Sequence, residues 1–181
     1  MDTYKTKWTR LQCGIFRFLC IRAGMKFNGR GIAKELKVSP TAVANALPEL
    51  EKEGLIRVEK SKTMNLFSIE FNRDNRNAID LKRVENLKQI YESGLISFLE
   101  EKFAGGTIIL FGSYSLGWDV SKSDIDIAII GRKDKTIDLG RYEKLLDRKI
   151  TINFYPSFKD IHKHLRNNIL NGILLSGGIE L

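Results

Sequence analysis

The sequence predicts an α+β protein in two parts, and three observations support this prediction. Apolar residues at helical spacing, followed by two short alternating runs, fill residues 1–72. A long helical pattern occupies residues 73–103. Short apolar strands then alternate with helices through residues 104–181. We therefore expect a helical first domain with a hairpin, a connector helix, and a second domain with a mixed sheet flanked by helices.

Three helices and a hairpin are expected in the first domain. The helices are predicted over Trp8–Arg22, Ile32–Leu36 and Pro40–Glu53, each with an apolar face. Two alternating runs, Leu55–Glu59 and Leu66–Glu70, predict a hairpin with a basic tip. Pro48 lies inside the third helix and removes a backbone hydrogen bond, so we expect the helix to kink or restart there.

The spacing of these elements resembles the winged helix-turn-helix family of bacterial and archaeal regulators, over residues 8–71. Two helices joined by a short turn place the second helix for the major groove of DNA, and the hairpin forms the wing. The resemblance implies DNA as a partner and homodimers as a common assembly. It also implies that the DNA-facing residues are Ser39, Thr41, Ala42 and Asn45 on the helix, with Lys60 and Lys62 on the wing. The alternative is a winged helix that contacts only protein.

The balance of charge favours a polyanion partner for the first domain. The net charge of the 181-residue chain is +8, and residues 1–60 hold 12 Lys and Arg against 6 Asp and Glu. The composition, with 43% hydrophobic and 29% charged residues, is that of a globular protein. Cys13 and Cys20 lie about two helical turns apart and do not form a disulfide. We find no signal peptide and no run of ~20 apolar residues, so we expect a cytoplasmic protein without a membrane partner.

The connector and the second domain follow from apolar spacing. One helix is expected over Asp74–Phe103, with an apolar stripe that includes Val84 and Tyr91. The elements expected after it are a strand at Thr107–Phe111, a helical turn at Ser113–Gly117, a strand at Asp124–Ile130, a helix at Asp138–Arg148, a strand at Lys149–Tyr155 and a helix at Ser157–Asn171.

Two short motifs in this domain point to phosphate chemistry. Asp124 and Asp126 alternate with isoleucines on a strand, so both carboxylates project from one face. Two carboxylates so placed can hold a pair of divalent ions about 4 Å apart, and Mg²⁺ suits carboxylate and phosphate oxygens. Gly112 and Ser113 stand where a strand turns into a helix, and backbone amides there can grip a phosphate. Trp118 stands where a P-loop requires lysine, which excludes that motif.

Gly112-Ser113, ten residues and then Asp124-Ile125-Asp126 resemble the signature of the nucleotidyltransferase superfamily related to DNA polymerase beta. The likeness is greatest to its minimal nucleotidyltransferase branch, over residues 104–178, and implies a short final strand at residues 173–177. It implies transfer of a nucleoside monophosphate from a nucleoside triphosphate, with ATP expected, to a hydroxyl. Asp124 and Asp126 would hold two Mg²⁺ ions, and Gly112 and Ser113 would bind the β- and γ-phosphates.

The sequence departs from that family at the third carboxylate, which normally comes from the next strand. Thr151, Asn153 and Tyr155 face the site there by alternation, and Asn153 offers a carbonyl oxygen without charge. Asp119 and Asp147 are further candidates, although neither matches the motif. Two alternatives to an active enzyme therefore stay open. One is a DNA-binding regulator whose second domain senses nucleotide, and the other is an antitoxin-like module that binds a protein partner.

The sequence leaves the acceptor open among a protein side chain, such as that of a partner toxin, a small molecule and a nucleic acid. Tyr114 and Trp118 lie near the motifs, where they either stack on a base or serve packing. His162 and His164, two residues apart in a predicted helix, are expected on the surface, on different faces.

Overall fold

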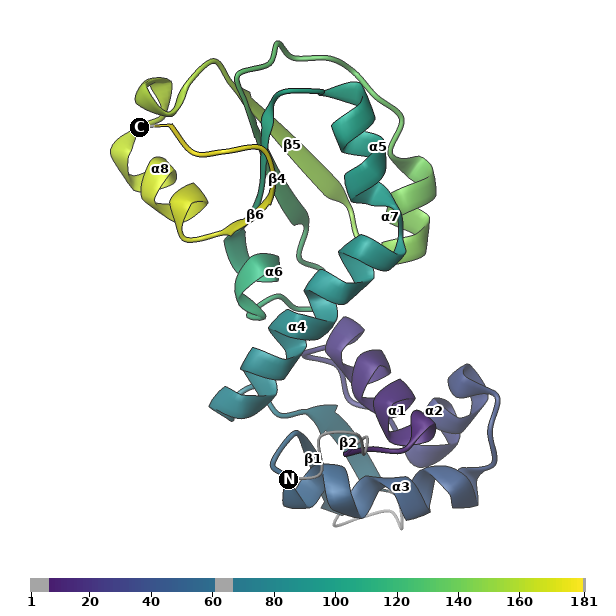
Figure 1. The fold of residues 1–181 in the computed structure, drawn as a ribbon. Helices are drawn as coiled ribbons and strands as arrows, with labels where there is room; N and C mark the ends of the chain where they lie inside the picture. Colours follow the sequence, from purple (N-terminus) through teal and green to yellow (C-terminus); the bar gives the residue numbers. More distant parts are fainter. Residues whose placement is uncertain (1–6, 61–66, 181) are drawn as a thin grey trace. The chain divides into compact units, whose positions relative to one another are not determined.

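The computed structural model describes residues 7–60 and 67–180. It divides into two compact units, Met1–Lys82 and Arg83–Leu181, which are described separately (Figure 1). Within the described residues, none of the helices combines the length and apolar composition that a membrane span requires. The α+β fold class expected from the sequence is confirmed.

The first unit is a winged helix. Its helices are α1 (Arg10–Ile21), α2 (Gly29–Leu36) and α3 (Pro40–Lys52), and its wing is an antiparallel pair of β1 (Ile56–Lys60) and β2 (Phe67–Phe71). All three helices are capped by side chains. Their apolar faces meet the wing in one core, whose fully buried members include Ile15, Leu19, Ile32, Val43, Leu50 and Ile69.

Helix α3 runs from Pro40 to Lys52 through Pro48, so the expectation that it restarts there was wrong. Pro48 is exposed, whereas Leu47 and Leu50 beside it are buried in the core. Because the core holds the helix on both sides of the proline, one missing backbone hydrogen bond does not end it.

The connector is helical, as predicted, but consists of two helices, α4 (Arg76–Glu92) and α5 (Leu95–Lys102). Gly94 separates them with φ +75°, and the amide of Leu95 donates to the Ser93 hydroxyl at 3.3 Å. The predicted apolar stripe also turns partly outward, because Val84 is 64% and Tyr91 55% exposed. Polar residues of α4, Asn86 among them, are buried instead, and Asn86 finds hydrogen-bond partners elsewhere in the second unit.

The second unit is a four-stranded mixed sheet in the order β5-β4-β3-β6. Its strands are β3 (Thr107–Phe111), β4 (Ile125–Ile130), β5 (Ile150–Tyr155) and β6 (Ile173–Ser176). Strand β3 pairs antiparallel with β4 and β6, and β4 pairs parallel with β5.

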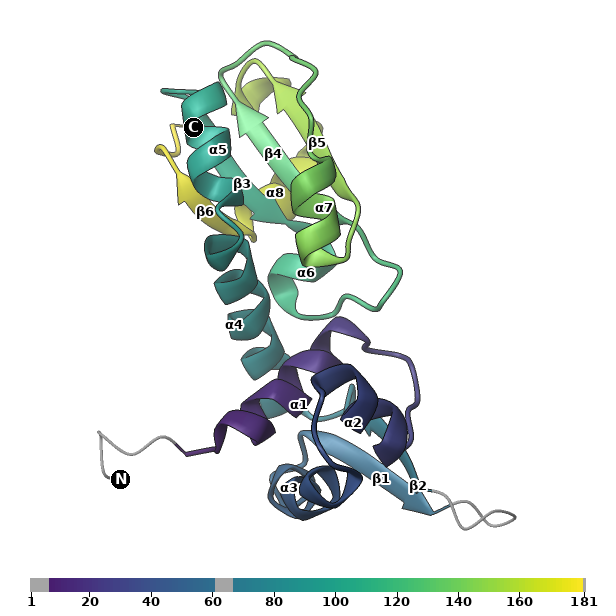
Figure 2. The ribbon, with the colours of Figure 1, turned by 90° about the vertical axis from the view of Figure 1, so that its right-hand side faces the viewer.

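Helices cover both faces of this sheet (Figure 2). On one face, α5 and α7 (Gly140–Leu146) pack on Ile125, Ile127 and Ile129. On the other, α8 (Lys163–Leu170) and a 3-10 turn at Phe158–Asp160 pack on Ala128 and Ile130. The helix expected over Ser157–Asn171 is thus two pieces, whereas the short final strand is present.

Candidate active site

The two sequence motifs lie at the same end of the β3–β4 pair. Phe111, the last residue of β3, pairs with Asp126 of β4, and the residue after it is Gly112. Along β4 the isoleucines point into the core under α5 and α7, so Asp126 points to the opposite face with Ala128 and Ile130. The alternation expected from the sequence therefore holds, and Asp124 precedes the strand with a half-buried side chain.

Gly112 opens the short helix α6 (Gly112–Leu116) with φ +73°. A Cβ atom at this residue would lie 2.7 Å from Oδ2 of Asp126, so the backbone approaches the carboxylate more closely than any side chain allows. The turn is fixed by two hydrogen bonds: the Ser115 hydroxyl donates to the Gly112 oxygen at 2.8 Å, and the Trp118 amide donates to the Ser113 oxygen at 3.0 Å.

Burial raises the pKa of Asp126 above its ordinary value, and the nearby charge of Asp124 raises it further. Asp126 is therefore harder to ionise than a free carboxyl, because it is partly desolvated and faces a second negative charge. A divalent cation between them would offset both effects, so the donor set fits such an ion.

Strand β5 supplies the neighbours of Asp126 on the same face. Its parallel register pairs Thr151 with Asp126 and Asn153 with Ala128, so Thr151 is the nearer of the two along the sheet. Tyr155 packs at the far end of the face against the core under α8. Among residues 7–60 and 67–180, no three His, Cys, Asp or Glu side chains are arranged to hold a metal ion. Mg²⁺ commonly binds through one or two carboxylates, with substrate phosphates and water as the other ligands.

The second unit matches a known protein family. Residues 92–175 match the family model described as "Nucleotidyltransferase domain". The second unit carries a nucleotidyltransferase domain. The match covers all the site residues expected from the sequence in this unit, from Gly112 to Asn153. No curated protein matches the chain.

Solved structures similar to the chain include adhesin competence repressor (AdcR) of Streptococcus pyogenes, with 20% identity, 54% of this chain and 69% of that chain covered, and a TM-score of 0.42. The zinc-responsive MarR family member ZitR of Lactococcus lactis is 22% identical, with 57% of this chain and 69% of that chain covered and a TM-score of 0.41. MepR of S. aureus, in complex with DNA, is 21% identical, with 52% of this chain and 73% of that chain covered and a TM-score of 0.39. Scores this low do not decide the fold, and the winged-helix assignment rests on the helices and hairpin described above.

In the nucleotidyltransferase domain, the two alternative acidic residues lie in other surroundings. Asp119 is buried and accepts a hydrogen bond from Asn86 at 2.7 Å, with Arg148 3.6 Å away. Asp147 is exposed and ends α7 with φ +51°. Asn86 and Arg148 were missed by sequence reasoning, because nothing in a sequence pattern tells a buried polar side chain from an exposed one.

Tyr114 and Trp118, which lie close to the motifs in the sequence, differ in exposure, and both histidines lie on the surface. Tyr114 is buried in the core under α5 and α7, so it serves packing. Trp118 is 57% exposed and stays a candidate for contact with a base. His162 and His164 are both exposed, but their rings lie 5.5 Å apart rather than on different faces, because α8 begins only at Lys163.

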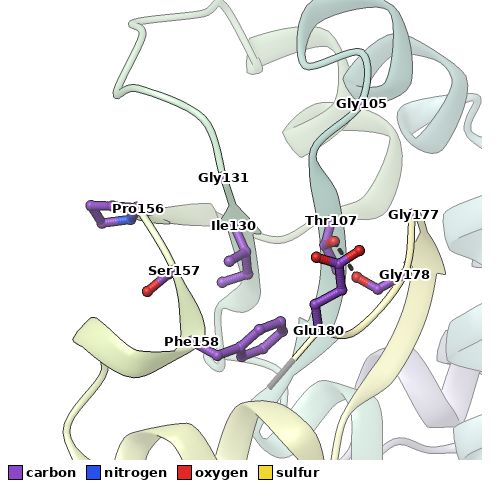
Figure 3. Close-up of a pocket in the computed structure, with 10 residues that line it drawn as sticks. All are labelled: Gly105, Thr107, Ile130, Gly131, Pro156, Ser157, Phe158, Gly177, Gly178 and Glu180. Atoms are coloured by element: carbon purple, nitrogen blue, oxygen red, sulfur yellow. Dashed lines mark hydrogen bonds between the residues drawn. The ribbon is translucent and has the colours of Figure 1, made fainter.

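A hollow of about 330 Å³ in the domain lies away from the motifs. Figure 3 shows its lining, which includes Thr107, Ile130, Gly131 and Phe158. Thr107 pairs with Ile130 at one end of β3 and β4, whereas Phe111 pairs with Asp126 at the other. The hollow is therefore at the opposite end of the sheet from Gly112 and is not the candidate site.

The predicted DNA-facing residues that the structure describes lie at the N-cap of α3, on α3 and at the end of β1. Ser39 is the N-cap of α3, and its hydroxyl accepts a hydrogen bond from the Ala42 amide at 3.1 Å. Thr41 and Asn45 are exposed on the outer face of the helix, and Ala42 is half-buried. Lys60 is exposed at the end of β1, and Lys62 lies outside the described residues.

Proposed function

We propose that the chain is a Mg²⁺-dependent nucleotidyltransferase that transfers a nucleoside monophosphate, with ATP as the expected donor, to a hydroxyl acceptor. The proximity of Gly112 to the Asp126 carboxylate carries this proposal, because it joins a phosphate-binding turn to a metal-binding carboxylate. The acceptor hydroxyl gives up its proton to water while its oxygen forms a bond to the α-phosphorus. The bond from that phosphorus to the oxygen that bridges to the β-phosphorus breaks, and pyrophosphate leaves.

The four motif residues have separate roles in this proposed transfer. The backbone of Gly112 and the hydroxyl of Ser113 bind the β- and γ-phosphates, and they orient the leaving group. Asp124 and Asp126 would hold two Mg²⁺ ions, which stabilise charge on the attacking and leaving oxygens. Both carboxylates are half-buried, so each is partly shielded from bulk water.

Strand β5 offers two residues for the third position of the site. Asn153, expected from the sequence, is a neutral carbonyl ligand, and Thr151 is the nearer neighbour of Asp126 along the sheet. Neither adds negative charge, so we expect a weaker second metal site than in a domain with three carboxylates.

We propose that the winged helix binds DNA through Thr41, Ala42 and Asn45 on α3, with Ser39 at its start and Lys60 and Lys62 on the wing. Support comes from the exposed polar face of α3 and from the basic surplus of residues 1–60. With DNA from a random pool, Lys60→Ala should weaken binding to all sequences and lower the salt slope by about 1, whereas Asn45→Ala should change sequence preference. Lys163→Ala, on α8, is the control, and equal behaviour of Lys60→Ala and Lys163→Ala would contradict the wing's role.

A second function is favoured by the absence of an acidic residue on β5, whose residues are Ile150–Tyr155. In this second function, the domain binds a nucleotide without catalysing its transfer, and the bound nucleotide regulates binding to DNA or to a protein partner. We also propose a cytoplasmic location for the chain, where nucleoside triphosphates are available. The domain limits at residues 72 and 103, a homodimer and a protein acceptor such as a toxin remain predictions.

Labelling with nucleoside triphosphates separates the two functions. The protein is incubated with each α-labelled triphosphate, Mg²⁺ and separate fractions of protein, RNA and small molecules. Transfer predicts label in one fraction that is lost with Asp126→Asn and retained with Asp134→Asn, an exposed carboxylate outside the site. Mg²⁺-dependent nucleotide binding without label in any fraction would favour the sensing function.

A further inference from the structure

A buried polar cluster joins three elements around the candidate site. Asn86 of α4 is 2% exposed, and its amide donates to the Tyr114 backbone oxygen at 2.9 Å and to Oδ1 of Asp119 at 2.7 Å. Asp119 is equally buried, and its Oδ2 lies 3.6 Å from a guanidinium nitrogen of Arg148. A buried ion pair constrains its surroundings, because separating the partners leaves a charge in the interior.

The two hydrogen bonds of Asn86 reach the residue after Ser113 and the segment that leads to Asp124. Tyr114 follows Ser113 in α6, so its backbone oxygen moves with the Gly-Ser turn. Asp119 lies in the segment that leads from α6 to Asp124. One side chain from a distant helix therefore ties the Gly-Ser turn to the segment that leads into the carboxylate strand.

Arg148 extends the cluster to the third element. It lies between α7 and β5, where its side chain donates to the backbone oxygen of Asp147 at 2.9 Å. The backbone oxygen of the next residue, Lys149, accepts from the amide of Ile125 at 2.8 Å. Arg148 therefore lies just before the point where β5 and β4 begin to pair.

We propose that Asn86 and the Asp119–Arg148 pair are positioning residues of the nucleotide site. They hold the Gly-Ser turn, the segment from Gly117 to Ser123 and the start of β5 at the spacing that nucleotide binding needs. Their functional meaning rests on the proposed nucleotidyltransferase activity. The positioning itself is a property of the metal-free protein and can be measured without any nucleotide.

Amide hydrogen exchange of the full chain tests the positioning. The probes are the amide of Trp118, which donates to the Ser113 oxygen, and the amide of Ser123, which donates to the Val120 oxygen. Ile127, in the middle of β4, reports the stability of the core. Asn86→Ala removes the side-chain amide that donates to the Tyr114 backbone oxygen and to Asp119. Gln89→Ala removes a similar amide one turn away, which bonds only within α4 at 3.4 Å, and is the matched control.

Asn86→Ala should lower protection at Trp118 and Ser123 about tenfold or more relative to Ile127, whereas Gln89→Ala leaves that ratio unchanged. Equal ratios in the two variants would overturn the proposal. Should Asn86→Ala fail to fold, Asn86→Ser keeps one short donor and serves instead, with the same expected direction.

Calorimetry with MgATP then tests the link to function. Asn86→Ala should bind MgATP about 10- to 100-fold more weakly than Gln89→Ala, the range found when a supporting residue of a metal site is lost. Equal affinities would overturn the functional role. If the wild type binds no MgATP while exchange shows a loosened segment, the proposed function is wrong and the positioning stands.

Discussion

A Cβ atom placed on Gly112 would lie 2.7 Å from Oδ2 of Asp126. The two residues are fourteen positions apart in the chain, yet the pairing of β3 with β4 brings them together at one end of the sheet. Glycine is favoured here by the positive φ of +73°, and a side chain added at this residue would force Oδ2 of Asp126 to move. This contact is the structural basis for treating the two motifs as one site.

Gly112→Ala should destabilise the protein and weaken MgATP binding. The left-handed conformation alone costs about 1–2 kcal/mol for alanine, and displacement of Asp126 adds to it. Gly131→Ala is the matched control, since Gly131 has φ +79° and a Cβ atom added there would meet nothing within 4 Å. Urea unfolding and calorimetry measure both effects. Equal losses of stability and unchanged MgATP affinity in both variants would show that the contact with Asp126 is unimportant.

Asp126→Asn should stabilise the metal-free protein at neutral pH. The folded chain raises the pKa of Asp126 above 3.8, so its ionisation is less favourable in the folded than in the unfolded state. The contribution of Asp126 to the stability of the metal-free wild type therefore falls as pH rises from 3.8 through the raised pKa. Asparagine removes this penalty, and for a half-buried group the gain stays under about 1 kcal/mol.

The gain from Asp126→Asn should vanish below pH 3.8, where the wild-type carboxyl is protonated in both states. Mg²⁺ with ATP should raise the melting temperature of the wild type and leave Asp126→Asn unchanged. Thermal unfolding of the wild type, Asp126→Asn and the control Asp134→Asn at a series of pH values measures these differences in stability. A stability difference that grows toward low pH would contradict the raised pKa.

A carboxylate added on β5 should strengthen metal binding, and the register identifies the better position. Thr151 pairs directly with Asp126, whereas Asn153 pairs with Ala128. We expect Thr151→Asp to tighten Mg²⁺-dependent nucleotide binding about tenfold or more, and Asn153→Asp to do so less. Calorimetric titration of both variants decides between them. A larger gain with Asn153→Asp would assign the third position to residue 153, and no gain with either would place it elsewhere.

Pro48→Ala should stabilise the first unit. The proline is exposed in the interior of α3, where alanine restores a backbone hydrogen bond to Ala44. A gain between about 1 and 3 kcal/mol in the free energy of unfolding follows from the helix preferences of the two residues. Glu49→Ala, at the next exposed position, controls for the surface change. A loss of stability with Pro48→Ala alone would show that the proline fits α3 better than its chemistry suggests.

Much of the second unit was predictable from local pattern. The strand Thr107–Phe111 agrees with its prediction because an apolar β-branched run is bounded by glycines on both sides. The face of Asp126 followed from the alternation of isoleucines in β4. Neither result needs information from another part of the chain.

The remaining features depend on contacts between distant residues. The helical spacing of apolar residues predicted one continuous connector helix through Gly94. In the structure, a positive φ at Gly94 separates α4 from α5. It also placed Val84 in the buried stripe, although α4 instead buries Asn86, whose partner Asp119 is 33 residues away in the chain. The neighbour of Asp126 on β5 depends on strand register, which a single strand's sequence does not specify.

Calorimetric titration of each nucleoside triphosphate, with and without Mg²⁺, tests the central claim most directly. The wild type, Asp124→Ala/Asp126→Ala and the control Asp134→Ala are compared. We predict Mg²⁺-dependent binding to the wild type and to the control, and its loss in the double variant. Absence of binding to the wild type under all conditions, or equal binding to the double variant, would contradict a nucleotide site at Gly112 and Asp126.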